Sequence, residues 1–375
     1  MSGFSFGFSG DDIDIDDADI QEVGQQSIGQ EAGTTSTLPE LMKAQRHGMD
    51  DWLRTLPSQI LYSKCVITSP LETGADTSAN VTVARRDVFD IRAQLMVEDS
   101  AEEQNGELIA GLEKGDINPN FYEGGFKTWE CSIDLGRLLV GEEVRGEDRH
   151  VVELGAGTAV PSLTLFAQLL SQTDSGSTEK RASRAHFTFA DYNSAVLRLV
   201  TLPNLILTWN YFTTQRNTAQ SSDLQDENQV DEPEEEMLDI TPELLSAFQT
   251  DLAKRGITIS FVSGAWSPTF VDLVFWSPEL VGFKTLVLAS ETIYSPPSLH
   301  AFSETLQALL ERPSAESRAL VAAKKVYFGV GGGVDEFLAV LRTISESSAS
   351  IKVEERLDVK SEGVGRTILE IAVGK

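Results

Sequence analysis

The sequence contains little cysteine and little histidine. Its only cysteines are Cys65 and Cys131, and there are four histidines in 375 residues. Two cysteines cannot build a disulfide framework and are typical of a reducing intracellular compartment. None of the histidines and cysteines has metal-ligand spacing, so we expect no metal site. No run of about 18 apolar residues is present, so we expect no membrane span.

Basic residues are scarce relative to acidic ones. The chain has 30 lysines and arginines against 58 aspartates and glutamates, which gives a formal net charge of −28. Because neutralising phosphates requires a basic face, we expect no direct nucleic-acid partner. The negative charge favours solvated acidic inserts, and a basic protein as the partner is the alternative.

Apolar residues are abundant enough for a large core, at 41% of the chain. Composition predicts an acidic, disordered arm over residues 1–44 that carries the aromatic motif FSFGFSG, and an extension over residues 45–115 packed on the next part. A catalytic α/β domain is predicted over residues 116–375, with polar inserts at 172–185 and 213–240.

The first residues are acidic and lack the basic start of a signal or transit peptide. We therefore expect a cytoplasmic protein and a monomer. Nuclear entry is left open, because no basic cluster stands out in the sequence.

The most informative stretch is HVVELGAGTAVPSL, from His150 to Leu163. Val151 and Val152 are adjacent apolar residues, which predicts a strand buried on both faces of an α/β sheet. Gly155 and Gly157 follow, and glycines let backbone N–H groups approach a ligand closely. Any strand-to-helix turn can use glycine, so this pattern alone does not decide between a ligand site and a simple turn.

Two neighbouring residues favour a particular ligand. A nicotinamide-type fingerprint G-x-G-x-x-G would need glycine at position 160, which is Val160. The acid Glu153 before the first glycine instead resembles the E/D-x-G-x-G loop of S-adenosylmethionine-dependent methyltransferases. That cofactor end carries no phosphate for a helix N-terminus to hold, and no lysine follows the glycines. The loop therefore predicts a methyl-donor site.

Residues next to other predicted strands can complete this site. Asp191 ends the strand at 186–190 (HFTFA), where it can accept hydrogen bonds from both ribose hydroxyls, although aspartate is also a common helix cap. Trp129 precedes the glycine strand, and Trp266 follows the strand at 257–262. Each indole offers a flat apolar wall for a ligand, and each is equally consistent with packing in the core.

The apolar strand at 285–289 (TLVLA) predicts a second set of functional residues. Polar groups at the carboxyl end of a central strand are where α/β sheets place chemistry, so Glu291 and Tyr294 are candidates to position an acceptor. KVYF, at 325–328, is predicted as a strand, and GVGGG, at 329–333, as a turn into a helix. A second nucleotide loop at GVGGG is the alternative, but the P-loop lysine is absent.

The remaining pattern alternates strands with helices and ends in a hairpin. LILTW, at 205–209, is predicted as a strand, and 241–254 as a helix that Gly256 ends. Residues 351–357 and 367–373 are predicted to pair as a terminal hairpin. Together these elements predict a Rossmann-like, seven-stranded, mostly parallel α/β sheet with one antiparallel strand near its edge, preceded by an N-terminal extension.

A series of motifs then identifies a resemblance. FYEGGFKTWECSIDL, VVELGAGTAVPSL, FADYN, SGAW, LASETIY and VYFGVGGG occur in the order found in the histidine protein N-methyltransferases of eukaryotes, in a fungal-type form. The resemblance runs from about Arg85 to the C-terminus and includes FSFGFSG. It implies a class I methyltransferase fold, S-adenosyl-L-methionine as cofactor, and methyl transfer to the distal ring nitrogen of a histidine in a large-subunit ribosomal protein.

The same resemblance implies roles for individual residues. The cofactor-binding residues would be Thr128, Trp129, Glu130, Cys131, Ser132, Glu153, Gly155, Gly157, Asp191, Tyr192, Asn193, Gly264, Trp266 and Ser290. Glu291 and Tyr294, in the acid-x-x-Tyr motif after the fourth strand of this group, would be the catalytic residues. The family commonly has cysteine between the two glycines; Ala156, found here, is small enough to preserve the turn.

The predicted chemistry is an in-line displacement onto a neutral imidazole nitrogen, in which orientation contributes about 7–11 kcal/mol. Histidine, with a pKa of about 6.5, is mostly neutral at cellular pH, so no strong base is required.

One alternative is the same fold methylating a lysine, which must first lose a proton. A non-catalytic, cofactor-binding ribosome assembly factor is another. Val160 and the lack of a catalytic constellation disfavour an NAD-dependent oxidoreductase.

Overall fold

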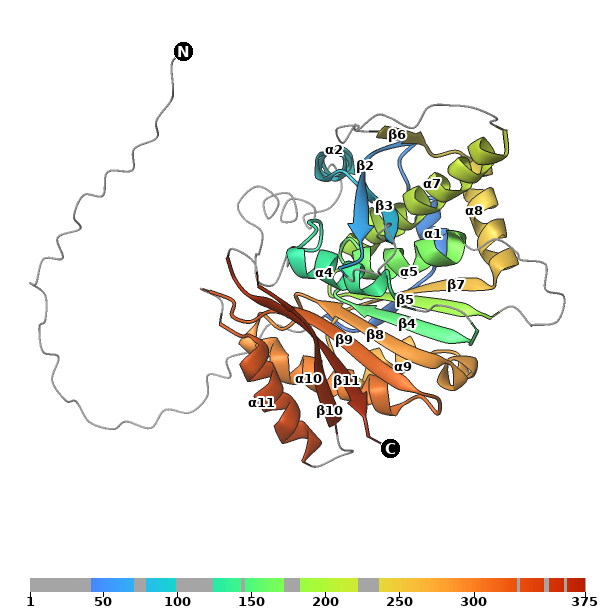
Figure 1. Cartoon of the computed structure of the whole chain (residues 1–375). Helices are drawn as coiled ribbons and strands as arrows, with labels where there is room; N and C mark the ends of the chain where they lie inside the picture. The colour runs from blue at the N-terminus through green and yellow to red at the C-terminus, as the bar shows by residue number, and fades with distance from the viewer. Residues whose placement is uncertain are drawn as a thin grey trace, which may run out of the picture. The chain divides into compact units, whose positions relative to one another are not determined.

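Five parallel strands form the centre of the protein in this computed structural model (Figure 1). Strand β4 (Arg149–Leu154) lies between β5 (Ala185–Asp191) and β8 (Lys284–Ser290) and runs parallel to both. Strands β7 (Ile257–Ser263) and β9 (Ser317–Lys324) extend this parallel region on its two sides. The glycine loop therefore follows the middle strand of the sheet.

Antiparallel strands complete the sheet at its two edges. β11 (Arg366–Val373) pairs with β9, and β10 (Ile351–Val359) pairs with β11 as the predicted hairpin. On the other edge, β1 (Gln45–His47) pairs with β7. The order is β1-β7-β5-β4-β8-β9-β11-β10. The predicted mostly parallel α/β fold is confirmed, with eight strands in place of seven because β1 adds to the β7 edge.

Helices cover both faces of this sheet (Figure 1). One face is covered by α4 (Glu130–Leu139), α5 (Val160–Ser171), α7 (Leu202–Ser221) and α8 (Pro242–Arg255), and the other by α9 (Pro268–Val274), α10 (Pro296–Glu311) and α11 (Val334–Ser345). In β4, Val151 packs in the first core and Val152 in the second. Adjacent apolar residues thus follow from burial on two sides, as predicted.

A second sheet is attached to α7. It has three antiparallel strands in the order β3 (Asn80–Arg86), β2 (Gln59–Thr68) and β6 (Glu236–Asp239). The backbone N–H of Ala84 donates to Thr208 Oγ1 of α7 at 3.0 Å. The extension and the end of the second insert therefore build one layer together.

The remaining elements are α1 (Met49–Leu53), α2 (Val88–Glu98), α6 (Ser194–Val196), a π-helical turn (Leu197–Thr201) and a 3-10 helix (Pro278–Gly282).

Helix α8 begins and ends where its sequence predicts. Thr241 precedes it, and its Oγ1 accepts a hydrogen bond from Leu244 N–H at 3.2 Å, while Pro242 occupies the first helical position. Gly256 ends the helix with a φ of +68°, and its N–H donates to Ala253 O at 3.1 Å. This left-handed cap is the reason for glycine at that position.

Two predicted strands are wrong. LILTW, at 205–209, lies within α7, which is buried between the large and the small sheet: Leu205 packs in the large core and Leu207 against the small sheet. A helix covered on all sides has an apolar run that resembles a buried strand. KVYF, at 325–328, lies just after β9, so the strand ends earlier than predicted.

The structure describes part of the chain. The described ranges are 42–70, 79–98, 124–142, 146–171, 183–221, 236–328, 331–346, 351–360 and 363–374. They belong to one compact unit, Leu41–Lys375. FSFGFSG and most of the predicted inserts lie outside the described residues. Within these ranges, no helix combines the length and the apolar character needed to cross a membrane.

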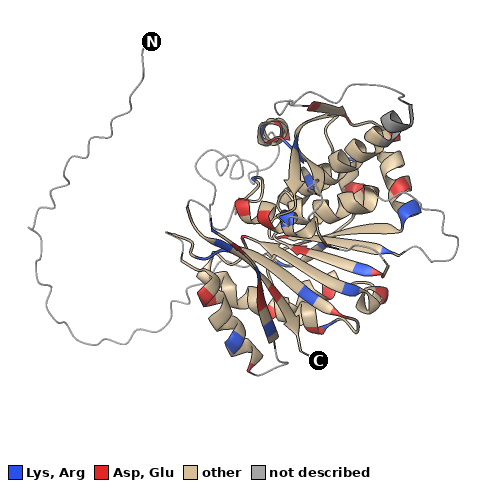
Figure 2. Cartoon of the chain, viewed as in Figure 1, with Lys and Arg blue, Asp and Glu red and all other residues tan. Residues whose placement is uncertain are grey.

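The central strands carry few charged side chains (Figure 2), but they contain two buried histidines. His150 Nε2 lies 2.8 Å from Thr188 Oγ1, and His186 Nδ1 lies 2.6 Å from Thr258 Oγ1. Burial lowers the pKa of His186 to about 4. Burial, followed by the neighbouring His186, lowers the pKa of His150 well below its usual value. Both rings are therefore neutral in the folded protein near pH 7.

Acid should destabilise the protein through these histidines. Between pH 6.5 and about 4, the unfolded chain binds a proton that folded His186 does not, so the free energy of unfolding falls as the pH falls. We expect His186→Asn to remove about 3 kcal/mol of this pH dependence, measured by urea unfolding across the window. His300→Asn, at an exposed site on α10, should keep the wild-type dependence. Identical profiles for both variants would contradict this role of His186.

Candidate functional site

The glycine loop between β4 and α5 is held against neighbouring backbone. Gly155 and Gly157 have φ values of +64° and +51°, in the left-handed region that favours glycine. Ala156 N–H donates to Ala190 O at 2.8 Å and so ties the loop to β5. A Cβ on Gly157 would lie 3.1 Å from Gly125 O. Glycine is therefore needed here for close approach as well as for the turn.

Asp191, the last residue of β5, organises the same loop. Its Oδ2 accepts a hydrogen bond from Gly157 N–H at 3.1 Å, and its Oδ1 accepts one from Asn193 N–H at 3.2 Å. Backbone N–H groups of the glycine loop and of the turn after β5 thus fix the carboxylate of Asp191 at the carboxyl end of β5. The arrangement fits the predicted role of Asp191 in holding two ribose hydroxyls.

Glu153 lies beneath the loop and is 1% exposed. Its Oε2 accepts a hydrogen bond from Ser162 N–H at 3.0 Å, while its buried Oε1 has no hydrogen-bond partner among the described residues. Burial raises the pKa of Glu153 to about 8, in spite of the bond from Ser162. Glu153 therefore joins β4 to the first turn of α5 and shapes the loop from its buried side.

Two of the predicted cofactor-binding residues, Tyr192 and Gly264, contact the chain just before β1. A Cβ on Gly264, where φ is +111°, would lie 2.6 Å from Lys43 O. Tyr192 Oη lies 3.5 Å from the backbone nitrogen of Met42, which donates to it. Trp266 packs against the core of the α9 and α10 face. The last residues of the predicted arm, 42–44, thus lie beside Gly264 and Tyr192, which the sequence analysis did not predict.

On the opposite side, the segment before α4 is attached to the glycine loop. Thr128 Oγ1 donates to Thr158 Oγ1 at 3.1 Å. Trp129 is half-buried, and its indole N–H donates to Gly124 O at 3.0 Å. The Lys324 ammonium lies 5.3 Å from the centre of the Trp129 ring. These contacts fix the indole of Trp129, a predicted cofactor-binding residue, next to a segment that is itself bonded to the glycine loop.

The first turn of α4 places three more predicted residues. Glu130 is exposed, and its Oε2 forms an ion pair of 3.3 Å with Lys324 Nζ. Cys131 and Ser132 are buried, and Ser132 Oγ donates to Trp129 O at 2.7 Å. Ser132 therefore supports the helix start, whereas Cys131 points toward the residues that follow β8.

Ser290 ends β8, and Glu291 follows it with an unusual backbone. Glu291 has a φ of +56°, which costs a non-glycine residue roughly 1–2 kcal/mol. Its N–H donates to Ala322 O at 3.0 Å, which holds this conformation. The side chain is 9% exposed, and its Oε1 lies 3.7 Å from Lys324 Nζ. A strained, buried carboxylate at the carboxyl end of a central strand is a typical functional position.

Two residues in this region were missed by the sequence analysis. Tyr327 packs against Tyr294 with ring centres 6.2 Å apart, and Lys324 pairs with Glu291. Both were missed because KVYF was predicted as a strand. The apolar run RALVAA, at 318–323, was the available signal, since a strand there places Lys324 and Tyr327 at the carboxyl edge of the sheet.

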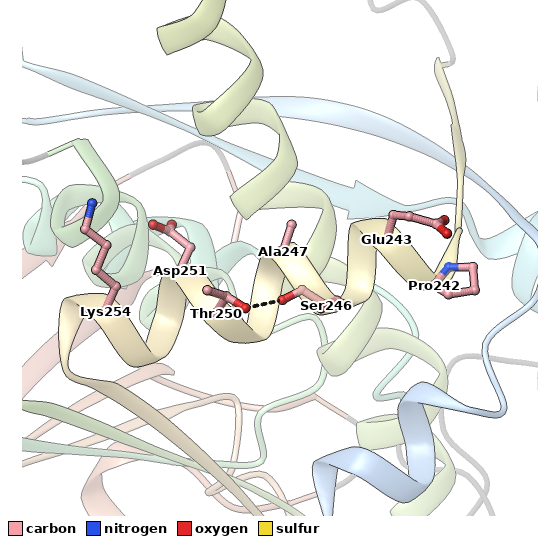
Figure 3. A pocket seen from close by; sticks show the side chains of 7 residues that line it. All are labelled: Pro242, Glu243, Ser246, Ala247, Thr250, Asp251 and Lys254. Atoms are coloured by element: carbon pink, nitrogen blue, oxygen red, sulfur yellow. Dashed lines mark hydrogen bonds between the residues drawn. The ribbon is translucent and has the colours of Figure 1, made fainter.

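Two hollows elsewhere on the surface are not the site. One, of about 640 Å³, is lined only by residues of α8, among them Glu243 and Asp251, and so is the open face of one helix (Figure 3). The other, of about 590 Å³, lies between α11 and the β10–β11 hairpin. Neither is lined by a predicted site residue. Among the described residues, no cluster of three histidines, cysteines or acids is arranged to hold a metal ion.

Gly155 offers a direct test of the loop geometry. A Cβ there would lie 2.8 Å from Thr292 Cγ2, whereas Gly256, at a similar φ, has no neighbour closer than 3.7 Å. We expect Gly155→Ala and Gly256→Ala each to lower the free energy of unfolding by about 1–2 kcal/mol. Only Gly155→Ala should also weaken S-adenosylmethionine binding, about tenfold by calorimetry. Equal affinities for the two variants would contradict this site.

Similarity to known proteins agrees with this geometry. Histidine protein methyltransferase 1 of Saccharomyces cerevisiae is 38% identical over 300 residues, which cover 78% of this chain and 76% of that protein. The Schizosaccharomyces pombe protein of the same name is 36% identical over 289 residues, covering 77% and 76%. No protein-family model matches the chain.

Among solved structures, the N-methyltransferase NodS from Bradyrhizobium japonicum covers 76% of this chain and 100% of its own. Its sequence is 12% identical, and the TM-score is 0.30. The fungal relatives are similar to this chain over about three quarters of its length. The chain therefore belongs to the histidine protein methyltransferase family and is an S-adenosylmethionine-dependent protein-histidine methyltransferase.

Proposed function

We propose that this enzyme methylates the distal ring nitrogen of a histidine in a large-subunit ribosomal protein. Membership of the family supports histidine as the acceptor. The net charge of −28 supports a basic protein as the partner, because opposite charge speeds association and disfavours acidic competitors. Acidic side chains lie on helices over both faces of the large sheet (Figure 2).

The observation that carries the proposal is the buried carboxylate of Glu291. Its Oε1 lies 3.7 Å from Lys324 Nζ and has no hydrogen-bond partner among the described residues, although buried acceptors are nearly always hydrogen-bonded. Glu291 lies next to Thr292, whose Cγ2 fills the space beside Gly155 of the glycine loop. Glu291 therefore lies close to the glycine loop, and the N–H of an imidazole placed at this edge would be a suitable donor to its carboxylate.

The expected chemistry follows from this placement. S-adenosylmethionine, when bound, supplies the methyl group. Glu291 accepts the N–H of the proximal ring nitrogen, so that the distal nitrogen presents its lone pair to the methyl carbon. After transfer the ring is cationic, and Glu291 is placed to take up the N–H proton. Because histidine is already neutral near pH 7, orientation by Glu291 and the Tyr294 ring supplies most of what the chain contributes.

The acceptor can be tested directly. The purified chain is incubated with labelled S-adenosylmethionine and with ribosomal proteins from cells that lack the enzyme, and the products are hydrolysed for amino acid analysis. We expect label in methylhistidine from one large-subunit protein. Label in methyllysine would overturn the acceptor. No label with intact cofactor binding would favour a non-catalytic assembly factor.

Removing the Glu291 carboxylate should slow turnover without affecting the cofactor. We expect Glu291→Ala to lower kcat at least tenfold, because the acceptor ring loses the group that orients it, while the Kd for S-adenosylmethionine changes less than twofold. Glu304→Ala, at an exposed position of α10, should leave both values unchanged. Unaltered kcat in Glu291→Ala would rule out this role.

A further inference from the structure

Lys324, the last residue of β9, contacts residues from both predicted parts of the site. Its Nζ forms ion pairs with Glu130 Oε2 at 3.3 Å and with Glu291 Oε1 at 3.7 Å. The same ammonium lies 5.3 Å from the centre of the Trp129 ring. Trp129 and Glu130 are predicted to bind the cofactor, and Glu291 is predicted to position the acceptor. One side chain therefore joins the two groups of residues.

The backbone of β9 determines where this side chain lies. Ala322 O accepts the hydrogen bond from Glu291 N–H at 3.0 Å, so Glu291 is attached to the same strand. Residues two apart in a strand lie on the same face of the sheet, and Ala322 packs in the core that α4 covers. The Lys324 side chain thus leaves β9 on the side of α4, where Glu130 begins that helix.

The two ion pairs differ in their exposure to water. The side chains of Lys324 and Glu291 are 21% and 9% exposed, whereas that of Glu130 is 60% exposed. Water screens an exposed pair more strongly, so the contact with Glu291 is the more restrictive of the two. Burial alone would lower the pKa of Lys324, but the charges of Glu291 and Glu130 outweigh burial and raise it. The ammonium therefore stays charged near pH 7.

A neighbouring ion pair holds α4 on this edge of the sheet. Arg366, opposite Lys324 in β11, pairs with Asp134 of α4 at 2.5 Å. Among the described residues, Glu130 and Glu291 form ion pairs with Lys324 alone. Without Lys324, α4 would keep its contact with the sheet, but Glu130 and Glu291 would lose the cation that joins them.

We propose that Lys324 is a positioning residue, whose ammonium holds the Glu291 carboxylate and the Trp129–Glu130 segment in one arrangement, so that acceptor and methyl donor meet in line. The inference rests on the proposed role of Glu291 and on the predicted cofactor contacts of Trp129 and Glu130. In-line displacement depends steeply on the distance and angle between the reacting atoms. Loss of Lys324 leaves each of the three side chains present but no longer joined.

Lys324→Met tests this role, because it removes the charge and keeps an unbranched side chain. We expect kcat to fall about tenfold, with less than about a threefold change in the Kd for S-adenosylhomocysteine and in KM for the acceptor protein. Lys324→Arg should recover kcat to within about threefold of the wild type, because a guanidinium can donate to two carboxylates. An unchanged kcat in Lys324→Met, or equal losses in the two variants, would overturn the proposal.

Lys284→Met is the matched control. Lys284 Nζ also pairs with two glutamates, Glu147 at 2.6 Å and Glu316 at 2.9 Å, but it lies at the start of β8, on the amino edge of the sheet. We expect this variant to lose some thermal stability and to keep kcat. A loss of kcat equal to that of Lys324→Met would show an effect of stability alone and would contradict the role of Lys324.

A double variant shows whether Lys324 acts through Glu291. If it does, the losses of kcat in Glu291→Ala and Lys324→Met combine to less than their product in Glu291→Ala/Lys324→Met. Fully multiplicative losses would mean that the two residues act independently, against the proposal. If the wild-type chain forms no methylhistidine, the proposed function itself fails, and that outcome is visible before any variant is compared.

Discussion

Close contact between backbone segments at the carboxyl edge of the large sheet is the constraint on which the site depends. Gly157 lies against Gly125, Gly264 against Lys43, and Gly332 against the segment that follows β8. In each case a side chain would occupy space that another main chain already fills. The loops after separate strands are therefore fixed relative to one another, and the side chains they carry need little reorganisation to act together.

Most of the central sheet could be predicted because each of its strands is recognisable from its own residues and from those next to it in the sequence. Adjacent apolar residues such as Val151 and Val152 indicate a strand covered on both sides, and glycine or proline marks where elements begin and end. The LILTW error, at 205–209, has a different origin, since burial of α7 depends on a second sheet that local sequence does not reveal. Strands β1 and β6 have no apolar pattern and exist because β7 and β2 offer them backbone partners.

The same distinction applies to the site. Asp191 and Glu291 could be found because each directly follows a strand that the sequence predicts well. Lys324 and Tyr327 were missed as site residues because the end of β9 was predicted too late in the sequence. The end of a strand depends on its pairing with neighbouring strands, which the local sequence specifies weakly. Met42 could not be found from its own neighbourhood, because its contact with Tyr192 joins segments 150 residues apart.

The extension pairs with strands that are synthesised much later. Gln59 in β2 lies opposite Asp239 in β6, 180 residues away, and His47 in β1 reaches Ser263, 216 residues away. Closing such long loops is entropically costly and slow, so these pairings wait for the central sheet and α7. A nascent chain thus holds β1 unpaired, and β2 paired with β3 alone, while the rest emerges. The contact of Lys43 with Gly264, next to β1, is consequently formed late, and the predicted cofactor site is complete only when this segment has docked on the folded remainder.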